Sequence, residues 1–158
     1  MRKRIIAQVQ KDTASPDQDW LNLEEVAEVE VTSEDAAHPI ESALLPSQSS
    51  SGWRAAEPGQ QTIRLLFNHP QRLRRIWMNF LEPGTERTHE YVLRWSPDNG
   101  QSFREIVRQQ WNFSPQDTTS ETEDYHVELP AVTVLELSII PDISGGNAFA
   151  SLTELRLA

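Results

Sequence analysis

The sequence predicts an all-β fold, an antiparallel β-sandwich or barrel, from three observations. Segments of alternating apolar and polar residues follow one another through most of the 158-residue chain. This period of two is the pattern of half-buried strands. Turn-forming residues separate the segments, and no long amphipathic helix lies between them, so the strand–helix alternation of a parallel sheet is absent.

Five segments carry the clearest alternation. They are TIRLLF (62–67), LRRIWMNF (73–80), EYVLRWS (90–96), DYHVELP (124–130) and VTVLELSII (132–140). In the third of these, Tyr91, Leu93 and Trp95 share one face, so we predict that they lie in the core. Before these segments, we predict a helical turn over 21–25 and a strand over 26–32.

Turn residues divide this series of strands. We interpret Asn68-His69-Pro70 as a turn between the first two alternating segments. SPDNGQSF (96–103) is the clearest hairpin signal, because an Asn-Gly pair readily adopts positive φ.

The Pro- and Ser-rich stretch over 44–52 could be a linker between two domains or a loop within one. Residues 1–37 are too few and too polar to form a folding unit, and Trp53 opens the same series of strands to which 26–32 belongs. We therefore predict one domain over 1–158, with a core over 26–157 and an N-terminal extension over 1–25. The stretch is then a loop on a rigid scaffold, where binding residues are common.

Composition excludes several classes of function. The chain has no cysteine, which excludes disulfides, thiolate zinc sites and cysteine nucleophiles. Its net charge of −10 argues against nucleic-acid binding, which needs a basic face. The stretch MRKRIIAQVQK contains no apolar run long enough for a secretion signal or a membrane span. We expect a soluble cytoplasmic protein that does not bind membranes.

Catalytic chemistry is not indicated. None of the common nucleophile, phosphate-binding or metalloprotease motifs occurs, and the four histidines lie in separate segments. We interpret His89 as a surface residue in a turn and the acidic run Glu121–Asp124 as a solvated face. We therefore predict that the chain is not an enzyme.

The five tryptophans are more informative. Trp53 and Trp95 are predicted to lie in the core. The alternation places Trp77 away from the core, and Trp111 lies among polar residues in QQWNFSPQ. Exposed indoles suit stacking on sugar rings or burial at a protein interface; packing beneath a long loop is the alternative for each.

The order of the segments resembles the discoidin family, also called coagulation factor 5/8 C-type domains, which has a galactose-binding-like jelly-roll fold. The matching segments are TSEDAAHPIESAL, SGWRAA, GQQTIRLLF, RIWMNF, EYVLRWSPDNGQSFREI and ASLTELRL. The pairing of SEDAAHPIESALL with WRAAEPGQQTI also looks like the N-terminal domain of the X-ray repair scaffold protein of single-strand-break repair, which has the same fold and binds proteins.

The discoidin resemblance implies a non-catalytic module that binds carbohydrate, lipid head groups or proteins through loops at one end of the sandwich. Many members hold a structural calcium ion with an Asp in an A-[IL]-D-G stretch and a Glu near the C-terminal strand. Here Leu45 and Pro46 replace that Asp and Gly, whereas Glu154 matches the Glu. Because calcium prefers six to eight oxygen ligands, we expect no bound cofactor, with Glu154 as the one candidate metal ligand.

We predict that the chain binds carbohydrate or a glycan-like ligand through loop side chains. The nominated ligand-binding residues are Trp111, Asn112, Arg54, His38 and Trp77. The alternative is a protein-interaction module that buries Trp77 and the arginines over 72–75.

Overall fold

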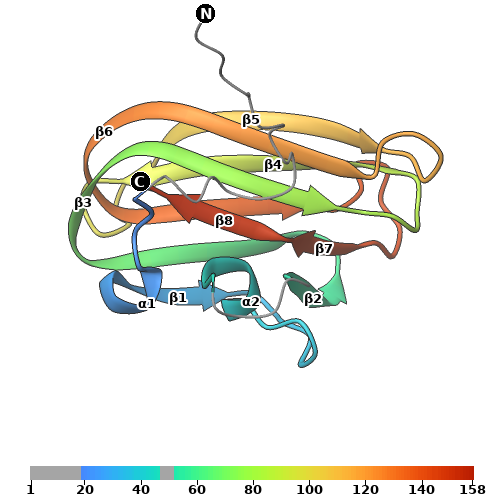
Figure 1. The fold of residues 1–158 in the computed structure, drawn as a ribbon, viewed down its shortest axis with the longest axis horizontal. Coiled ribbons are helices and arrows are strands. Elements are labelled where there is room, and N and C mark those ends of the chain that lie inside the picture. Colours follow the sequence, from blue (N-terminus) through green and yellow to red (C-terminus); the bar gives the residue numbers. More distant parts are fainter. Residues whose placement is uncertain (1–18, 47–51) are drawn as a thin grey trace, which may run out of the picture.

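Two long antiparallel strands dominate the fold of the computed structural model, which describes residues 19–46 and 52–158 (Figure 1). They are β3 (Gln61–Leu81) and β6 (Ser120–Ile140). The other described elements are α1 (Leu23–Val26), β1 (Ala27–Val31), α2 (Glu41–Leu44), β2 (Trp53–Pro58), β4 (Arg87–Ser96), β5 (Arg104–Phe113), β7 (Phe149–Leu152) and β8 (Glu154–Leu157). Neither described helix has the length or the apolar character to cross a membrane.

The two long strands are paired along nearly their whole length, and each one bends so that it contributes to two layers (Figure 1). In the broad layer, the first part of β3 and the last part of β6 lie side by side, with β1 beyond β3 and β4, then β5, beyond β6. In the narrow layer, the last part of β3 lies between the first part of β6 and β8. β2 and β7 form a separate antiparallel pair.

The bend shows that one predicted turn is wrong. The segment 68–70 does not end a strand, because the chain continues through it as β3. Instead, the pairing register with β6 shifts several times between Leu66 and Arg75. Pro130 of β6 lies in the same irregular region, where a residue without an N–H costs no regular ladder hydrogen bond. Prolines therefore mark a bend in each strand here, and the strands do not end.

The core lies between the layers, where alternation predicts it. Tyr91 and Leu93 of β4 are fully buried and Trp95 is 6% exposed, as expected from their shared face. Trp53, at the start of β2, is also in the core, at 1% exposure, and its indole N–H donates to the Ser33 carbonyl at 3.0 Å. The predicted placement of Trp53 and Trp95 is confirmed.

The predicted hairpin is confirmed between β4 and β5, which are antiparallel partners. Asn99 and Gly100 have φ values of 61° and 89°, the left-handed region that an Asn-Gly pair tolerates. The Asp98 carboxylate fixes the turn by accepting the Ser102 backbone N–H at 2.9 Å and its hydroxyl at 2.6 Å.

Strands on both sides of the serine-rich stretch share one sheet. Residues 47–51 of that stretch lie outside the described residues. β1, which precedes it, pairs with β3, which follows it, from Ala27 opposite Phe67 to Val31 opposite Ile63. The chain on both sides therefore contributes to the same core, as a loop requires. The predicted boundaries of the domain and of its N-terminal extension stay predictions.

We predict that Trp53→Ala lowers the free energy of unfolding by about 3–5 kcal/mol, the usual cost of deleting a large buried aromatic side chain. Trp53→Phe should cost about 1–2 kcal/mol, because it keeps an aromatic ring but leaves the Ser33 carbonyl without its donor. Chemical denaturation of both variants measures the difference. A loss below about 1 kcal/mol for Trp53→Ala would contradict the core assignment.

Candidate functional site

Connecting segments of the fold gather at one end of the sandwich, on the right in Figure 1. These are the segments 32–40, 59–60, 82–86, 114–119 and 141–148. Two nominated residues, His38 and Arg54, come together at this loop end. Trp111 and Asn112 lie on β5 and Trp77 lies on β3, whereas His38 and Arg54 lie in the segment 32–40 and on β2.

Backbone hydrogen bonds fold the segment 33–40 onto the start of β2. The Asp35 N–H donates to the Arg54 carbonyl at 2.8 Å, the Arg54 N–H donates to the His38 carbonyl at 3.2 Å, and the His38 N–H donates to the Asp35 carbonyl at 2.8 Å. The Glu34 carboxylate supports the same loop by accepting the Ile40 N–H at 2.8 Å. This closed set of bonds holds Asp35, His38 and Arg54 side by side.

Gly52 allows β2 to start where it does. Its φ is 73°, and a Cβ added to it would lie 2.6 Å from the Leu152 carbonyl oxygen of β7. Only glycine permits this close approach of the two backbones. The sequence Gly52-Trp53-Arg54 thus places a buried indole and an exposed guanidinium at adjacent positions of the same strand.

The Asp35 carboxylate orients His38. Its Oδ2 lies 3.0 Å from His38 Nδ1, and its Oδ1 accepts the Ala37 N–H at 3.2 Å. The hydrogen bond to His38, then that to Ala37, lowers the pKa of Asp35, and the charge of Arg54 acts in the same direction. Because an ionised carboxylate only accepts hydrogen bonds, neutral His38 carries its hydrogen on Nδ1, which leaves Nε2 as an acceptor.

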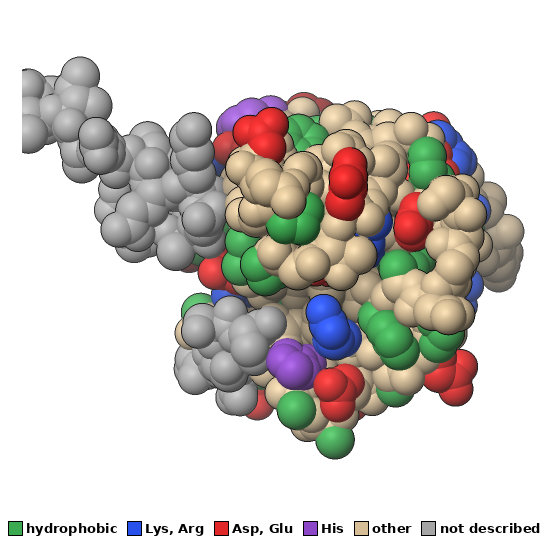
Figure 2. Space-filling view, turned by 90° about the vertical axis from the view of Figure 1, so that its right-hand side faces the viewer, with side chains coloured by type: hydrophobic (Ala, Val, Ile, Leu, Met, Phe, Trp, Pro, Cys, Tyr) green, Lys and Arg blue, Asp and Glu red, His purple; other side chains and the backbone are tan. Residues whose placement is uncertain are grey.

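An exposed aromatic ring lies on the same side of the β2–β7 pair as Arg54. Arg54 is opposite Ser151 in register, and their neighbours Trp53 and Leu152 are buried, so Arg54 and Ser151 face outward. Phe149 lies two residues before Ser151, about 7 Å along the strand, and is 37% exposed. We call this group the Arg54 surface: Asp35, His38, Arg54, Phe149 and Ser151. Figure 2 faces the loop end and shows a histidine, a basic and an acidic side chain next to one another there.

Sequence reasoning missed Asp35 and Phe149. An Asp three residues before a His in a short polar turn is a signal for a side chain that organises the loop. Phe149 lies two residues after the Gly145-Gly146-Asn147 turn, but the four-residue strand that contains it is too short for alternation to orient the ring.

Trp111 does not form an open platform. Its ring is half-buried and packs against the core, and its Nε1 is buried without a hydrogen-bond partner among the described residues. Asn112 is exposed on β5, and its side-chain oxygen accepts the Thr88 hydroxyl hydrogen at 2.8 Å. The ligand-binding roles assigned to these two residues remain untested, and neither lies in the Arg54 surface.

Trp77 is buried, which is the packing that the sequence left open as the alternative to an exposed indole. Its neighbours Ile76 and Met78 belong to the core cluster, so Trp77 faces outward as the alternation predicts, yet it is only 5% exposed. The outer face of the narrow layer is covered here. Arg156, the cross-strand partner of Trp77, is also buried and donates to the Ala43 carbonyl of α2 at 2.8 Å.

The nearby arginines are engaged in ion pairs. Arg72 lies 3.1 Å from a Glu128 oxygen, and Arg75 makes a two-pronged contact with Asp124 at 2.7 and 2.8 Å. The arginines proposed for a protein interface therefore have carboxylate partners within their own chain.

The residues around Glu154 do not fit a calcium site. Its carboxylate lies 3.4 Å from Arg156 Nη2, and burial raises its pKa, which opposes the ionised form that a cation needs. Leu45, which follows α2, supplies no side-chain oxygen. Within 19–46 and 52–158, no group of three or more His, Asp or Glu side chains is arranged to hold a metal ion.

A polar cluster is buried between the layers, where sequence reasoning placed surface residues. His89 is 1% exposed and Glu121 is fully buried, and His89 Nε2 lies 2.5 Å from Glu121 Oε1. The surface interpretation of His89 and of the start of the acidic run is therefore wrong. Both residues lie on the inward face of their strands, and the rings of Phe80, Tyr91 and Phe113 surround His89.

Burial sets the protonation of this pair. It lowers the pKa of His89 to about 3, with the nearby Arg87 charge adding to the effect. It also raises the pKa of Glu121 to about 7 and that of Glu123 to about 7, the latter with a contribution from Glu121. His89, Glu121 and Glu123 are therefore uncharged under mildly acidic conditions, and the tautomer of His89 decides whether Glu121 or His89 donates in their hydrogen bond.

Comparisons with known proteins give a clear result at the level of the fold. No protein-family profile matches the sequence, and no curated protein is significantly similar to it. Solved structures are similar. A family 32 carbohydrate-binding module from Clostridium perfringens, in complex with galactose, gives a TM-score of 0.63 at 13% identity, over 87% of this chain and 96% of that chain.

Two further structures agree. A second module from C. perfringens, in complex with GalNAc-β-1,3-galactose, gives a TM-score of 0.63 at 19% identity, over 87% of this chain and 98% of that one. A pectin-binding carbohydrate-binding module gives a TM-score of 0.60 at 14% identity, over 84% of this chain and 90% of that chain. The predicted jelly-roll β-sandwich of galactose-binding-like type is confirmed. The resemblance to the repair-scaffold domain stays a prediction.

We predict that the buried carboxyls make the protein less stable as the pH rises. A carboxyl whose pKa is raised on folding adds to the free energy of unfolding. This contribution is fully present below its ordinary pKa of 4.5 and is lost as the pH rises through about 7. His89 acts oppositely: its contribution is complete above its ordinary pKa of 6.5 and is lost as the pH falls towards 3. Glu121→Gln should therefore reduce the loss of unfolding free energy between about pH 5 and about pH 8, by on the order of 3 kcal/mol.

Denaturation midpoints measured across this range for wild type and Glu121→Gln test the prediction. Glu128→Gln, an exposed change on the same strand, is the control. Identical pH profiles for wild type and Glu121→Gln would contradict it.

We predict that millimolar calcium leaves the melting temperature unchanged. A ligand that binds only the folded state raises stability by RT ln(1 + [L]/Kd), and the residues around Glu154 do not supply the oxygens for such binding. Thermal unfolding with calcium and with a chelator measures the effect. A rise of several degrees that Glu154→Gln removes would show that a calcium site exists.

Proposed function

We propose that this chain is a non-catalytic carbohydrate-binding module and that the Arg54 surface is its binding site. The observation that carries the proposal is the joint placement of Arg54, His38 and Asp35, with an exposed Phe149 on the same side of the β2–β7 pair as Arg54. Hydrogen-bond donors, hydrogen-bond acceptors and an aromatic face are thus available on one surface.

Each side chain matches a feature of a sugar ring. The Arg54 guanidinium has several donors in a fixed fork and can bind two neighbouring hydroxyl oxygens. His38 Nε2 and the remaining lone pairs of Asp35 accept hydroxyl hydrogens. The face of Phe149 suits the apolar C–H face of the ring. Because backbone bonds already fix Asp35, His38 and Arg54, binding needs little reorganisation of this loop.

The similar structures support the carbohydrate class. Two of them are in complex with galactose and with GalNAc-β-1,3-galactose, and a third is a module that binds pectin. The protein-interaction alternative has weaker support, because Trp77 is buried and the arginines Arg72 and Arg75 pair with carboxylates of the same chain.

We predict that Arg54→Ala and Phe149→Ala each weaken glycan binding by about tenfold or more, since each removes a strong hydrogen-bonding group or the stacking face. Both residues are exposed, so the free energy of unfolding should change by less than about 1 kcal/mol. A glycan array with wild-type protein identifies the ligand, and calorimetric titration of the variants measures the loss.

Arg108→Ala is the matched control, because Arg108 is an exposed arginine on β5, away from the Arg54 surface. Its binding should equal that of wild type. Wild-type affinity in Arg54→Ala, or an equal loss in Arg108→Ala, would remove the site from this surface. An array without any glycan signal, together with capture of a specific protein, would favour the protein-interaction alternative.

A further inference from the structure

The outer face of the broad layer carries a row of alternating charges across four strands. Glu30 of β1 is opposite Arg64 of β3, Arg64 is opposite Glu136 of β6, and Glu136 is opposite Arg94 of β4. This row lies on the outer face of the sheet, whereas the residues of the Arg54 surface come from the segment 33–40 and from β2 and β7.

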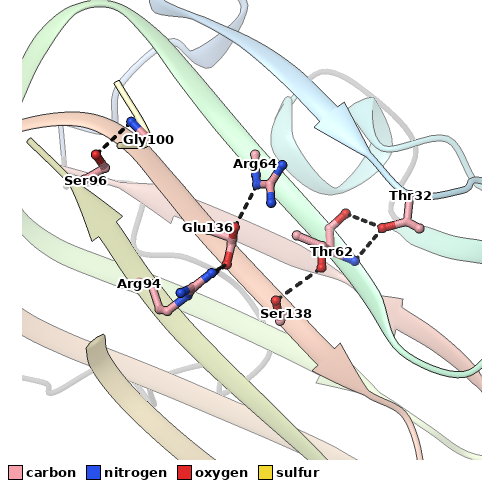
Figure 3. Close-up of polar contacts among 8 residues, drawn as sticks. All are labelled: Thr32, Thr62, Arg64, Arg94, Ser96, Gly100, Glu136 and Ser138. Carbon is pink, nitrogen blue, oxygen red and sulfur yellow. Dashed lines mark hydrogen bonds and ion pairs between the residues drawn. The ribbon is translucent and has the colours of Figure 1, made fainter. Parts of the chain in front are cut away.

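Glu136 fixes both arginines (Figure 3). Its side chain is 2% exposed although it lies on an outward face. Arg64 Nε donates to Glu136 Oε2 at 2.7 Å, and Arg94 donates to Oε1 through Nε at 2.9 Å and also through Nη2. Burial opposes the ionised form, but these hydrogen bonds outweigh it and lower the pKa of Glu136. Each guanidinium is therefore held by its Nε.

Glu30 and Arg64, the cross-strand pair at the β1 edge of the row, do not form an ion pair. Arg64 and Glu30 are opposite each other, yet neither makes an ion pair or hydrogen bond with the other, and Arg64 has Glu136 as its one polar partner within the described residues. Opposite charges at such positions ordinarily attract one another. Glu136 draws Arg64 away, so the terminal nitrogens of Arg64 and the carboxylate of Glu30 stay available on either side of a gap.

That gap is a groove. It has a volume of about 370 Å³ and is lined by Glu30, Val31, Thr32, Thr62 and Arg64. The Thr62 hydroxyl lies 3.2 Å from the Ser138 hydroxyl, and either of the two can be the donor. Figure 3 shows Thr62 between Thr32 and Ser138, beside the Arg64–Glu136 contact. The groove therefore combines charged donors, a charged acceptor and hydroxyl groups, without an aromatic side chain.

This combination selects for a neutral polyhydroxylated ligand. Each sugar hydroxyl is both a donor and an acceptor, so neighbouring hydroxyls can accept from Arg64 and donate to Glu30. An anionic ligand is disfavoured, because Glu30 and Glu136 flank Arg64 and the chain carries a net charge of −10. We propose that this groove binds the hydroxyl edge of a neutral glycan chain, as a second carbohydrate site separate from the Arg54 surface.

Two-dimensional ¹H–¹⁵N NMR titrations of the full chain test this site. The probes are neutral tetrasaccharides of galactan, mannan, xylan and β-1,4-glucan, with a tetragalacturonate as the anionic comparison. At least one neutral probe should shift the amide signals of residues 30–32 and 62–64, and the shifts should persist in Arg54→Ala. Glu30→Ala should weaken this binding by about tenfold, the loss expected when hydroxyls lose a charged hydrogen-bond partner.

Glu28→Ala is the control, because Glu28 is an exposed glutamate two residues away on the same face of β1. It should bind like wild type. The proposal is overturned if no neutral probe shifts residues 30–32 and 62–64, if tetragalacturonate binds there more tightly, or if both glutamate variants lose affinity equally. Because the Arg54 surface gives separate signals from residues 35–38, 54 and 149, failure of one site is distinguishable from failure of the other.

Discussion

The antiparallel pairing of β3 with β6 is the interaction on which the other parts of this structure depend. Each strand has 21 residues and crosses from the broad layer to the narrow layer. The other strands of the larger sheet build outward from this pair: β1 and β8 pair with β3, β4 pairs with β6, and β5 pairs with β4. Their pairing register shifts at the bend, where both strands pass from one layer to the other.

This arrangement separates the sandwich into a closed end and an open end. At the left in Figure 1, β3 and β6 turn from one layer to the other as continuous strands. At the opposite end, the connecting segments meet, and their side chains can vary without disturbing the ladder. Asp35, His38 and Arg54 lie there on a short network of backbone bonds. A rigid pair of strands with loops at one end is a common arrangement for a binding site.

Two buried carboxyl groups of this fold each carry a desolvation cost. Glu136 on the outer face and Glu121 between the layers are both buried, but their surroundings differ. Two arginines compensate the charge of Glu136, whereas Glu121 lies beside a neutral histidine and has one oxygen without a hydrogen-bond partner among the residues that the structure describes. The first carboxylate organises a surface that we propose binds sugar. The second makes the interior sensitive to pH, since it must lose its proton in a site with little compensation.

Much of the fold could be predicted from the sequence, because alternation reports directly which residues face the core. It placed Tyr91, Leu93 and Trp95 correctly and identified the hairpin at Asn99-Gly100. It failed where the same pattern has two physical explanations. A proline in an alternating run indicates either a turn or a bend, and the segment 68–70 is a bend because the partner strand bends with it.

The candidate site was harder to predict. The sequence nominated His38 and Arg54, and the structure brings these two residues together although they lie on either side of the serine-rich stretch. Whether Trp77 is exposed or buried stayed open, because alternation reports which face a side chain occupies but not what covers that face. Phe149 was missed because its exposure follows from the short β2–β7 pairing, a long-range contact that sequence periodicity does not encode. The absence of catalytic activity and the cytoplasmic location stay predictions.

The most direct test of the account is a crystal structure of this chain with the glycan that it binds best on an array. We expect a sugar ring stacked on Phe149, with ring hydroxyls within hydrogen-bonding distance of the Arg54 guanidinium and of His38 Nε2. A glycan bound elsewhere on the sandwich, with the Arg54 surface unoccupied at saturating concentration, would contradict the assignment of that surface as the binding site.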